Sequence, residues 1–347
     1  MRKMETLLLL SPELSVEQRE TILSTMDGVE VLAALGELTP RPKVLVVSQF
    51  SSGNVANLAA AGGADYFMLK PCKPTSVCER IRQMAAPAFP AEDAARVGGV
   101  NMEGPFIAEG RKGAQLAEHI LPPDIGLLRH WREISGGLVK LIDVAPEQPG
   151  GMAFVKAARE LCHVSIAHTV ADYDQAKAAF DAGIDHATHL FNAMAGLHHR
   201  EPGVVGAVFD DDRVYAEMIC DGLHLHPAVL RTAFRLLGDR AMVISDCMRA
   251  GGMPEGETAE LGGQTVYVKN GRATLADGTL AGSVTNLLDE VRNLVRFGIP
   301  LEQAVKAASY TPARSLGLEK DIGSIAPGKR ADLLVLDDEL QLMGVYH

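Results

Sequence analysis

The chain alternates short apolar segments with longer amphipathic ones from about residue 43 to residue 247, and this alternation constrains the fold more than any other feature. The short segments are rich in Val, Ile and Leu, and the longer ones have the apolar spacing of helices, which is the pattern of βα units on a parallel sheet. Eight candidate strands follow one another, at 44–48, 65–70, 100–103, 139–146, 164–168, 187–191, 216–221 and 242–246. Eight such units predict a (βα)8 barrel, for which a chain of 347 residues is long enough.

Several segments have the apolar spacing of helices, and two of them have a recognisable end. The segments with helical spacing include 171–182, 227–237, 284–297 and 301–309. The first two are followed by Gly183 and Gly238, and glycine commonly ends a helix.

Further β structure is expected after the eighth strand. Asn270-Gly271 lies between candidate strands 265–268 and 273–275 and predicts a type I′ hairpin. The closing segment GSIAPGKRADLLVLDD predicts a small β appendage, whose strand partners are not evident in the sequence.

Composition and charge exclude several classes of protein. Hydrophobic residues make up 47% of the chain and charged residues 22%, as in ordinary globular proteins. A formal net charge of -11 offers no basic surface for nucleic acid or an anionic membrane, although a phosphorylated ligand needs only a local cationic pocket. Five cysteines without paired spacing predict no disulfide framework and fit a reducing cytoplasm. The apolar run near the N-terminus is too short for a signal peptide or membrane span, so we expect a buried strand in a soluble protein.

Polar side chains lie at or near the carboxyl ends of six of the predicted strands. They are Glu103, Glu147, His168, His189, Asp221 and Asp246. In a (βα)8 barrel this end of the strands carries the catalytic residues. The sequence therefore predicts an enzyme active site there.

Glu103, His168 and His189 form a candidate metal site. Two imidazoles and one carboxylate suit a divalent ion of intermediate softness, and three protein ligands leave one position open, as in catalytic zinc sites. We expect one ion per chain, with zinc as the first candidate and iron or manganese as alternatives. For each histidine taken alone, the alternative is simple hydrogen bonding within the barrel mouth.

Asp246 ends the last predicted strand, opposite the expected metal. A carboxylate in that position can accept a proton from an attacking water and return it to a leaving amine, so we assign it as general base and acid. The alternative role is the N-cap of a following helix.

A series of motifs resembles the N-acetylglucosamine-6-phosphate deacetylases, a family within the amidohydrolase superfamily. In order, the motifs are NMEGPF, KGA, VAPE, HTVADY, THLFNAM, REPG, CDGLHLHP, LAGS and GxIAPGKRADL, and the resemblance covers residues 98–337. It implies metal-dependent hydrolysis of the acetamide of N-acetylglucosamine 6-phosphate to glucosamine 6-phosphate and acetate, by a homodimer active in amino-sugar catabolism. Another amidohydrolase acting on a small amide, or a degenerate non-catalytic receiver-fusion protein, is the alternative.

The resemblance also implies roles for single residues. It places the metal at Glu103, His168 and His189, and the catalytic carboxylate at Asp246. Its substrate-binding positions correspond to Ala114, Asn192, Ala193, Arg200, His224 and Leu280. Arginine suits a phosphate because its planar fork can hold two oxygens, but Arg200 could instead form a surface salt bridge, and Asn192 could cap a helix.

Gln115 replaces a histidine that many members of the family carry to steady the carbonyl oxygen of the substrate. A glutamine amide can also donate a hydrogen bond to a developing oxyanion. We therefore expect Gln115 to take part in catalysis.

The first 97 residues depart from that family. Its members would carry half of a β-sandwich and the first two barrel strands there, with a His-x-His pair, whereas here no histidine precedes His119. Residues 1–90 instead resemble an incomplete response-regulator receiver of the sporulation-regulator type, with Ser48 and Lys70 at the switch and lysine positions. No strand ends in a phospho-acceptor aspartate, so a working phosphorylation switch is not expected.

The sequence therefore predicts two parts, a partial receiver-like segment at 1–97 and an amidohydrolase barrel with a C-terminal β segment at 98–347. Strands 44–48 and 65–70 are expected to replace the two missing barrel strands. The alternative is an incomplete receiver beside an incomplete barrel.

Overall fold

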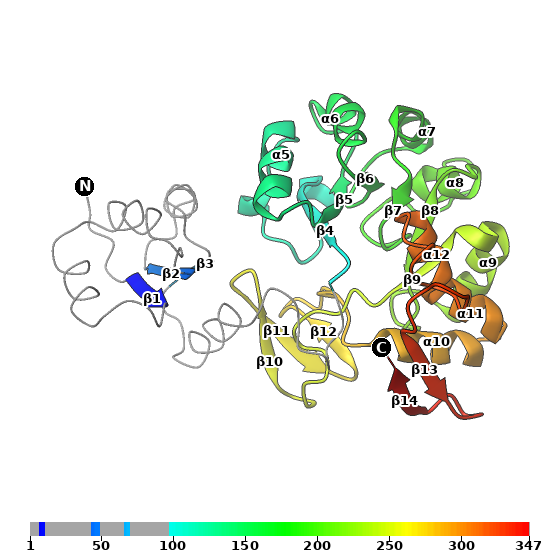
Figure 1. The fold of residues 1–347 in the computed structure, drawn as a ribbon. Helices are drawn as coiled ribbons and strands as arrows, with labels where there is room; N and C mark the ends of the chain where they lie inside the picture. Colours follow the sequence, from blue (N-terminus) through cyan, green and yellow to red (C-terminus); the bar gives the residue numbers. More distant parts are fainter. Residues whose placement is uncertain (1–6, 11–42, 49–65, 70–96, 347) are drawn as a thin grey trace, which may run out of the picture. The chain divides into compact units, whose positions relative to one another are not determined.

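The computed structural model describes residues 97–346 in full and, before them, the backbone of three short strands, β1 (Leu7–Leu10), β2 (Lys43–Ser48) and β3 (Tyr66–Leu69). The chain divides into two compact units, Met1–Val97 and Gly98–His347 (Figure 1). All of the side chains discussed below belong to the second unit.

A six-stranded parallel sheet is the centre of the second unit, and its strands lie side by side in sequence order. The strands are β4 (Val100–Phe106), β5 (Val139–Val144), β6 (His163–Ile166), β7 (His186–Ala187), β8 (Tyr215–Ile219) and β9 (Ala241–Ile244). Six of the eight predicted strands are thus confirmed as neighbours in one parallel sheet. The sheet ends at β4 on one side and at β9 on the other.

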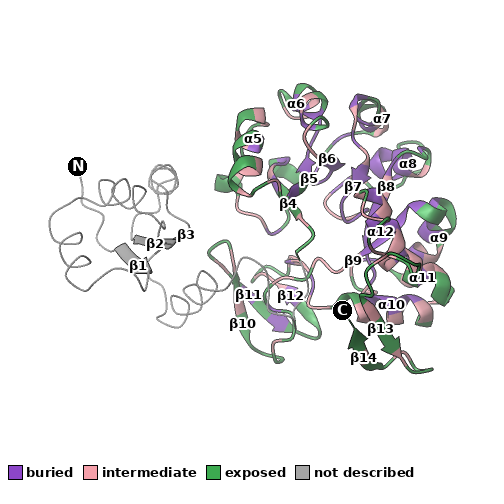
Figure 2. Cartoon of the chain, in the orientation of Figure 1, coloured by how far each residue is buried: buried purple, intermediate pink, exposed green. Residues whose placement is uncertain are grey.

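Helices and short 3-10 segments come between and after the strands, and the longer helices lie along the outer side of this sheet (Figure 1). They are η1 (Glu109–Arg111), η2 (Ala117–His119), α5 (Ile125–Ile134), α6 (Gly151–Ala158), α7 (Tyr173–Ala182), α8 (Gly203–Phe209), α9 (Pro227–Leu237), η3 (Gly238–Arg240), α10 (Leu287–Arg296), α11 (Leu301–Ala308) and α12 (Tyr310–Ser315). Helix side chains such as Leu128, Phe154 and Phe234 join the strands in one buried core. Figure 2 shows this division, with buried residues on the strands and inner helix faces and exposed ones outside. Each fully buried side chain of this size contributes roughly 1.5–3 kcal/mol.

Capping residues explain why two predicted helices begin later than expected. Helix α7 begins at Tyr173 because the Asp172 side chain accepts a hydrogen bond from the backbone N–H of Gln175, and the Gln175 side chain accepts one in return from the Asp172 N–H. Helix α10 begins at Leu287 because the Asn286 side chain accepts a hydrogen bond from the backbone N–H of Asp289.

In the first unit, the three described strands form a sheet of their own. Strand β2 pairs antiparallel with β1 and parallel with β3. The predictions of strands at these positions are confirmed, but the expected replacement of two barrel strands by β2 and β3 is not confirmed. The predicted likeness to a receiver falls largely outside the described residues.

The β structure after the parallel sheet consists of two antiparallel groups. The first is formed by β10 (Thr258–Leu261), β11 (Gln264–Lys269) and β12 (Arg272–Thr274), and the second is the pair β13 (Leu333–Leu336) and β14 (Leu342–Tyr346). Asn270 and Gly271 join β11 to β12 with φ values of 54° and 66°, as a type I′ turn requires. The predicted hairpin is confirmed. The partner of the predicted closing strand is β14.

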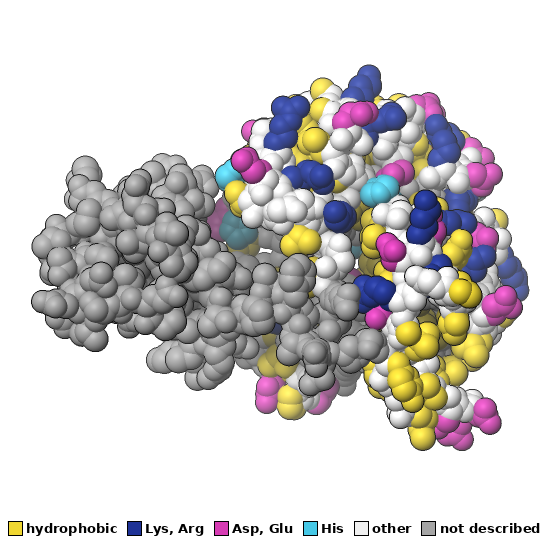
Figure 3. Space-filling model, viewed as in Figure 1, with side chains coloured by type: hydrophobic (Ala, Val, Ile, Leu, Met, Phe, Trp, Pro, Cys, Tyr) yellow, Lys and Arg dark blue, Asp and Glu magenta, His cyan; other side chains and the backbone are white. Residues whose placement is uncertain are grey.

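The β13–β14 hairpin exposes apolar side chains. In Figure 3, hydrophobic side chains gather where Figure 1 places these strands. They include Leu334, Leu342, Met343, Val345 and Tyr346, which are 48–68% exposed. Two strands alone cannot form a second layer that would bury these groups.

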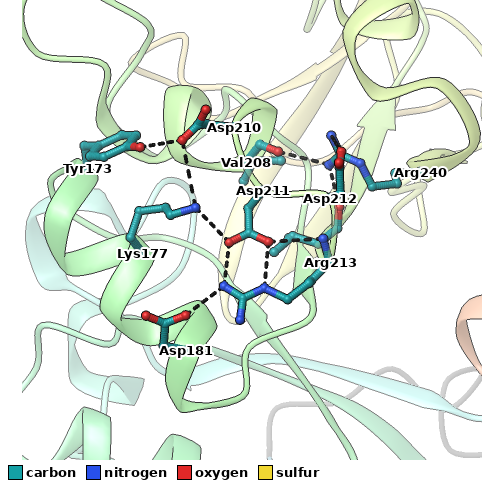
Figure 4. A network of polar contacts seen from close by, with 10 residues as sticks. Tyr173, Lys177, Asp181, Val208, Asp210, Asp211, Asp212, Arg213 and Arg240 are labelled. Carbon is teal, nitrogen blue, oxygen red and sulfur yellow. Dashed lines mark hydrogen bonds and ion pairs between the residues drawn. The ribbon is translucent and has the colours of Figure 1, made fainter.

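A polar network anchors α7 to the loop between α8 and β8 (Figure 4). Its centre is Asp211, a carboxylate with 4% of its side chain exposed. Asp211 accepts hydrogen bonds from Lys177 Nζ at 2.9 Å and from Arg213 Nη2 at 2.7 Å. These bonds hold the pKa of Asp211 well below its usual range, with the bond from Arg213 contributing most.

Replacing Asp211 with asparagine is expected to lower the free energy of unfolding by about 2 kcal/mol, because hydrogen bonds from charged groups to a buried carboxylate are lost. A carboxyl group whose pKa is lowered on folding stabilises the folded state above its unfolded pKa, which is about 3.9, and loses that contribution as the pH falls through its folded pKa. The difference between wild type and variant should therefore be full at pH 7 and shrink below about pH 4. Urea denaturation at both pH values measures it.

Asp181→Asn is the matched control. Asp181 also accepts from Arg213 Nη2, at 2.8 Å, but its side chain is 70% exposed. Exposed ion pairs contribute about 0–1 kcal/mol, so this variant should remain close to wild type. Equal destabilisation by the two substitutions would contradict a central role for Asp211.

Candidate metal centre and substrate cavity

Three of the predicted site residues lie just beyond strand ends with unusual backbone conformations. His168, His189 and Asp246 each come two residues after the last residue of β6, β7 or β9. Their φ values are 45°, 36° and 45°, in the left-handed region that residues other than glycine seldom adopt. Such conformations cost of order 1–3 kcal/mol each and gather at functional sites. The recurrence at the ends of three strands of one sheet therefore supports a shared function.

The structure brings Glu103, His168 and His189 together. Glu103 Oε1 lies 2.7 Å from His168 Nε2 and 3.4 Å from His189 Nε2, and the two Nε2 atoms are 3.1 Å apart. The histidine side chains are 7% and 5% exposed, and that of Glu103 is 37% exposed. One potential ligand atom from each residue thus lies within 4.8 Å of the others.

The far side of the His168 ring shows which nitrogen is free to bind a cation. His168 Nδ1 lies 2.7 Å from the backbone carbonyl oxygen of Arg111, which can only accept a hydrogen bond. Nδ1 therefore carries the hydrogen, and the lone pair of the neutral ring is on Nε2, which faces Glu103 and His189. Metal-binding histidines commonly have this arrangement. The donor set fits a divalent ion such as zinc.

Electrostatics agree with this geometry. Burial alone would raise the pKa of Glu103, but its close contacts with the His168 and His189 rings bring it well below its usual range. Burial opposes the charged form of His168, and the close contact with Glu103 and its negative charge nevertheless raise the pKa of His168. An ionised carboxylate beside two imidazoles is therefore the stable form.

Asp246 faces the same cavity as these residues. Burial and the nearby negative charge of Glu103 raise the pKa of Asp246 to about 6. A carboxyl group with a pKa close to neutrality is suited to accept and return a proton.

A cavity of about 590 Å³ opens in front of the three grouped residues. Its lining includes the predicted site residues Glu103, Ala114, Gln115, His168, His189, Asn192, Ala193, His224, Asp246 and Leu280. Leu261 and Gly262 of the β10–β11 hairpin also line it. The small antiparallel sheet thus contributes to a site whose three grouped residues lie in or just beyond the parallel strands.

Gln115 and Asn192 are both engaged with backbone carbonyl groups. The amide of Gln115 donates to the carbonyl oxygen of Glu103 at 3.2 Å, and that of Asn192 donates to His189 O at 3.1 Å. Gln115 would have to turn to reach a substrate oxygen. Asn192 holds the turn that carries His189 and does not cap a helix, since the next helix starts only at Gly203.

Arg200 is the one predicted site residue that does not line the cavity. It is exposed, and within the described residues its side chain forms no ion pair. Its backbone N–H donates to His198 Nδ1 at 3.4 Å. The alternative surface salt bridge is therefore not seen among the described residues, and the phosphate contact stays a prediction.

Two other polar residues at strand ends position their neighbours. Glu147 accepts hydrogen bonds from Thr169 Oγ1 at 2.5 Å and from Val170 N at 2.8 Å, which fixes the segment after His168. Asp221 accepts from His224 N at 2.8 Å and lies 2.7 Å from His224 Nδ1. Asp221 therefore orients the His224 ring at the cavity wall.

Two buried carboxyl groups beneath the site were missed from the sequence. Asp143 in β5 is fully buried, and burial followed by the charge of Glu103 raises its pKa well above the usual range. Glu217 in β8 is 6% exposed, and burial raises its pKa to about 8. Thr188 Oγ1 donates to Asp143 Oδ1 at 3.0 Å. The only sequence signal was one acidic residue inside each apolar strand.

Comparison with known proteins identifies a family. Residues 129–345 match the model of the amidohydrolase family. The chain is 41% identical over 264 residues to the N-acetylglucosamine-6-phosphate deacetylase of Lysinibacillus sphaericus, covering 75% of this chain and 68% of the relative. It is 37% identical over 254 residues to the N-acetylgalactosamine-6-phosphate deacetylase of Escherichia coli O157:H7, covering 73% and 67%.

Solved structures give the same result. An N-acetyl-D-glucosamine-6-phosphate deacetylase mutant of Mycobacterium smegmatis, in complex with N-acetyl-D-glucosamine-6-phosphate, has a TM-score of 0.68 at 37% identity, with 72% of this chain and 66% of that chain covered. The N-acetylglucosamine-6-phosphate deacetylase of Pasteurella multocida has a TM-score of 0.69 at 28% identity, with 82% and 75% covered. The chain spans about two thirds of the length of the curated relatives that it matches, 68%, 66% and 62% for the first three.

Proposed function

The chain belongs to the amidohydrolase family, and from this premise we propose that it hydrolyses the acetamide of N-acetylglucosamine 6-phosphate to glucosamine 6-phosphate and acetate. The observation that carries the proposal is the grouping of Glu103, His168 and His189 around one point, with Asp246 facing the same cavity. The names of the relatives supply the substrate class. A cavity of about 590 Å³ is large enough for a small ligand of this kind.

Glu103, His168 and His189 would hold the ion. When bound, a divalent ion supplies Lewis acidity toward water and toward the carbonyl oxygen of the substrate. The chain contributes the fixed geometry: His168 is oriented by the Arg111 carbonyl, and His189 by the turn that Asn192 closes. Burial of both imidazoles keeps bulk water away from their nitrogens.

Asp246 moves the proton. Its carboxylate takes a proton from the attacking water as the new C–O bond forms at the acetamide carbon. It then returns that proton to the amine nitrogen as the C–N bond breaks, so that acetate and the free amine leave. The raised pKa of Asp246 favours both steps near neutral pH.

Other residues of the cavity lining would bind the sugar and its phosphate. His224, held by Asp221, and the backbone around Ala193 and Leu280 are available there. Gln115 would stabilise the carbonyl oxygen after its amide leaves the Glu103 carbonyl. The relative that acts on N-acetylgalactosamine 6-phosphate makes the epimeric sugar the second candidate substrate.

The test of this proposal is acetate release from three sugars under identical conditions: N-acetylglucosamine 6-phosphate, N-acetylgalactosamine 6-phosphate and unphosphorylated N-acetylglucosamine. We expect the highest kcat/KM with the first and the lowest with the third. Equal rates with and without the phosphate would favour the alternative of another small-amide hydrolase. Faster turnover of the epimer would correct the sugar and leave the reaction unchanged.

Arg200→Ala tests the phosphate contact that the sequence predicts. We propose that Arg200 reaches the phosphate from the segment just before α8 when substrate binds. Loss of a charge-assisted hydrogen bond worth about 1.5–3 kcal/mol should then lower kcat/KM for the phosphorylated sugar roughly 10- to 100-fold. Activity on the unphosphorylated sugar should not change.

Arg235→Ala is the control. Arg235 is an exposed arginine on α9, so its replacement removes the same charge from the chain. It should leave kcat/KM for both sugars close to wild type. If Arg200→Ala behaves like this control, Arg200 does not bind the phosphate.

Three further properties complete the proposal. Zinc is the proposed ion, a homodimer the proposed assembly and the cytoplasm the proposed location, all on the basis of the sequence. Among the residues that the structure describes, no helix combines the length and the apolar character needed to cross a bilayer.

A further inference from the structure

A second group of potential ligands lies at the other end of the same strands. His163 begins β6 and His186 begins β7, and Asp185 comes directly before β7. We call these three residues the amino-end cluster. One ligand atom from each lies within 4.8 Å of the others, as in the group around Glu103.

The contacts within the amino-end cluster are short and all converge on one carboxylate. His163 Nδ1 lies 2.7 Å from Asp185 Oδ2, and His186 Nδ1 lies 2.7 Å from Asp185 Oδ1. Each carboxylate oxygen thus faces a different imidazole. The pairing of β6 with β7 fixes this arrangement, because the Asp185 N–H donates to Val164 O at 3.1 Å.

Burial and charge distinguish this cluster from an ordinary surface ion pair. His186 is 1% exposed, while the side chains of His163 and Asp185 are 34% and 38% exposed, so one edge remains open to solvent. Within the described residues, no lysine or arginine pairs with Asp185. Its partners are two imidazoles, which offset its charge only when they are protonated. A divalent cation would offset it at any pH at which the imidazoles are neutral.

The two nitrogens of the His186 ring have different surroundings. Nδ1 faces Asp185, so it is the ligand atom that the ring offers to the cluster. Nε2, on the opposite edge of the ring, is buried and has no hydrogen-bond partner among the described residues, and the residue lines a second cavity of about 530 Å³. A buried polar atom without a partner is unusual in proteins.

We propose that the amino-end cluster binds a divalent transition-metal ion of the zinc class, through His163, His186 and the carboxylate of Asp185. Two imidazoles and one carboxylate are a donor set that zinc accepts, and the exposed edge leaves a position for water. The site is distinct from the one at Glu103. His163 and His168 are five residues apart on and beyond β6, or about 16 Å in extended chain. The role is structural, joining the amino ends of β6 and β7.

The test counts zinc in the full chain without reference to catalysis. Protein stripped with a chelator is dialysed against zinc, and the bound metal is measured by atomic emission. A first variant, His168→Ala, removes a ligand of the centre at Glu103. The second variant combines His168→Ala with Asp185→Asn, which keeps the shape of the Asp185 side chain and removes its charge. We expect the second variant to bind one zinc fewer than the first, with affinity at the amino-end cluster reduced at least tenfold, as for groups that support metal binding.

The controls separate this site from other binding. Cys162→Ser alters the thiol beside His163 in sequence and should leave the zinc count unchanged. His163→Gln, at the partly exposed edge, is a second route to losing the same zinc, and circular dichroism shows whether each variant is folded. Asp185→Asn in an otherwise wild-type chain should retain acetate release.

Equal zinc counts with and without Asp185→Asn, or with and without His163→Gln, would overturn the proposal and leave a hydrogen-bonded His–Asp–His group. Because the count is made in a chain lacking His168, failure of the proposed deacetylase activity cannot produce that result.

Discussion

Replacing Asp246 with asparagine is expected to lower kcat for acetate release by roughly 10²- to 10⁴-fold, the range for removal of a positioned general acid or base. Asparagine keeps the size of the side chain and can still hydrogen-bond, but it cannot take the proton from the attacking water. The metal content should not change, because Asp246 is not one of the three grouped ligands. Parallel measurement of acetate and bound metal tests both statements.

Cys247→Ser is the matched control for this variant. Cys247 is the next residue and lines the same cavity, so the substitution alters the same loop without removing the carboxylate. Its kcat should remain close to wild type. An Asp246→Asn protein with unchanged turnover would remove Asp246 from the mechanism, whereas loss of activity together with loss of metal would make it a ligand.

His168→Ala is expected to abolish both metal binding at this centre and acetate release. His168 Nε2 is within reach of both other ligands, and loss even of a group that supports a ligand costs about 10- to 100-fold in metal affinity. Direct loss of a ligand should cost more than that. Equilibrium dialysis against zinc measures the affinity, and acetate release at saturating substrate measures the consequence.

His199→Ala provides the comparison, since His199 is exposed and does not line the cavity. It removes one imidazole from the chain and should change neither quantity. A His168→Ala protein that binds zinc at this centre with wild-type affinity would show that Glu103, His168 and His189 are grouped only by hydrogen bonding at the edge of the sheet.

The sheet and the polar residues at its edge were predictable because both depend on local pattern. Alternation of apolar runs and helical spacing located all six strands of the parallel sheet. Carboxyl ends of parallel strands meet at one edge, so residues as far apart as Glu103 and His189 could be grouped without knowing any distance.

Side-chain direction was less accessible, because it depends on backbone conformation and on which groups remain buried. The left-handed φ values of His168, His189 and Asp246 turn these residues beyond the strand ends, and no sequence rule required them. Glu147 shares the same edge but bonds to the segment after His168. Arg200 matches a motif, yet its exposed position depends on a loop conformation that the motif does not specify.

Buried acids were missed for a related reason. Asp143 and Glu217 each interrupt an apolar strand, and a single polar residue in a strand usually points to solvent. Here both point into a buried layer beneath Glu103, whose negative charge helps to keep them protonated. The amino-end cluster is similar, because His163 and Asp185 are 22 residues apart and meet only through the β6–β7 pairing.

The most direct test of the central claim is acetate release from N-acetylglucosamine 6-phosphate by the full chain, first stripped of metal and then reloaded with zinc in steps. We expect no release above background from the stripped protein, and release that rises with zinc bound at the centre formed by Glu103, His168 and His189. The claim would be contradicted by a reloaded protein that holds zinc at this centre and still releases no acetate. Zinc is assigned to this centre if the His168→Ala variant does not bind it.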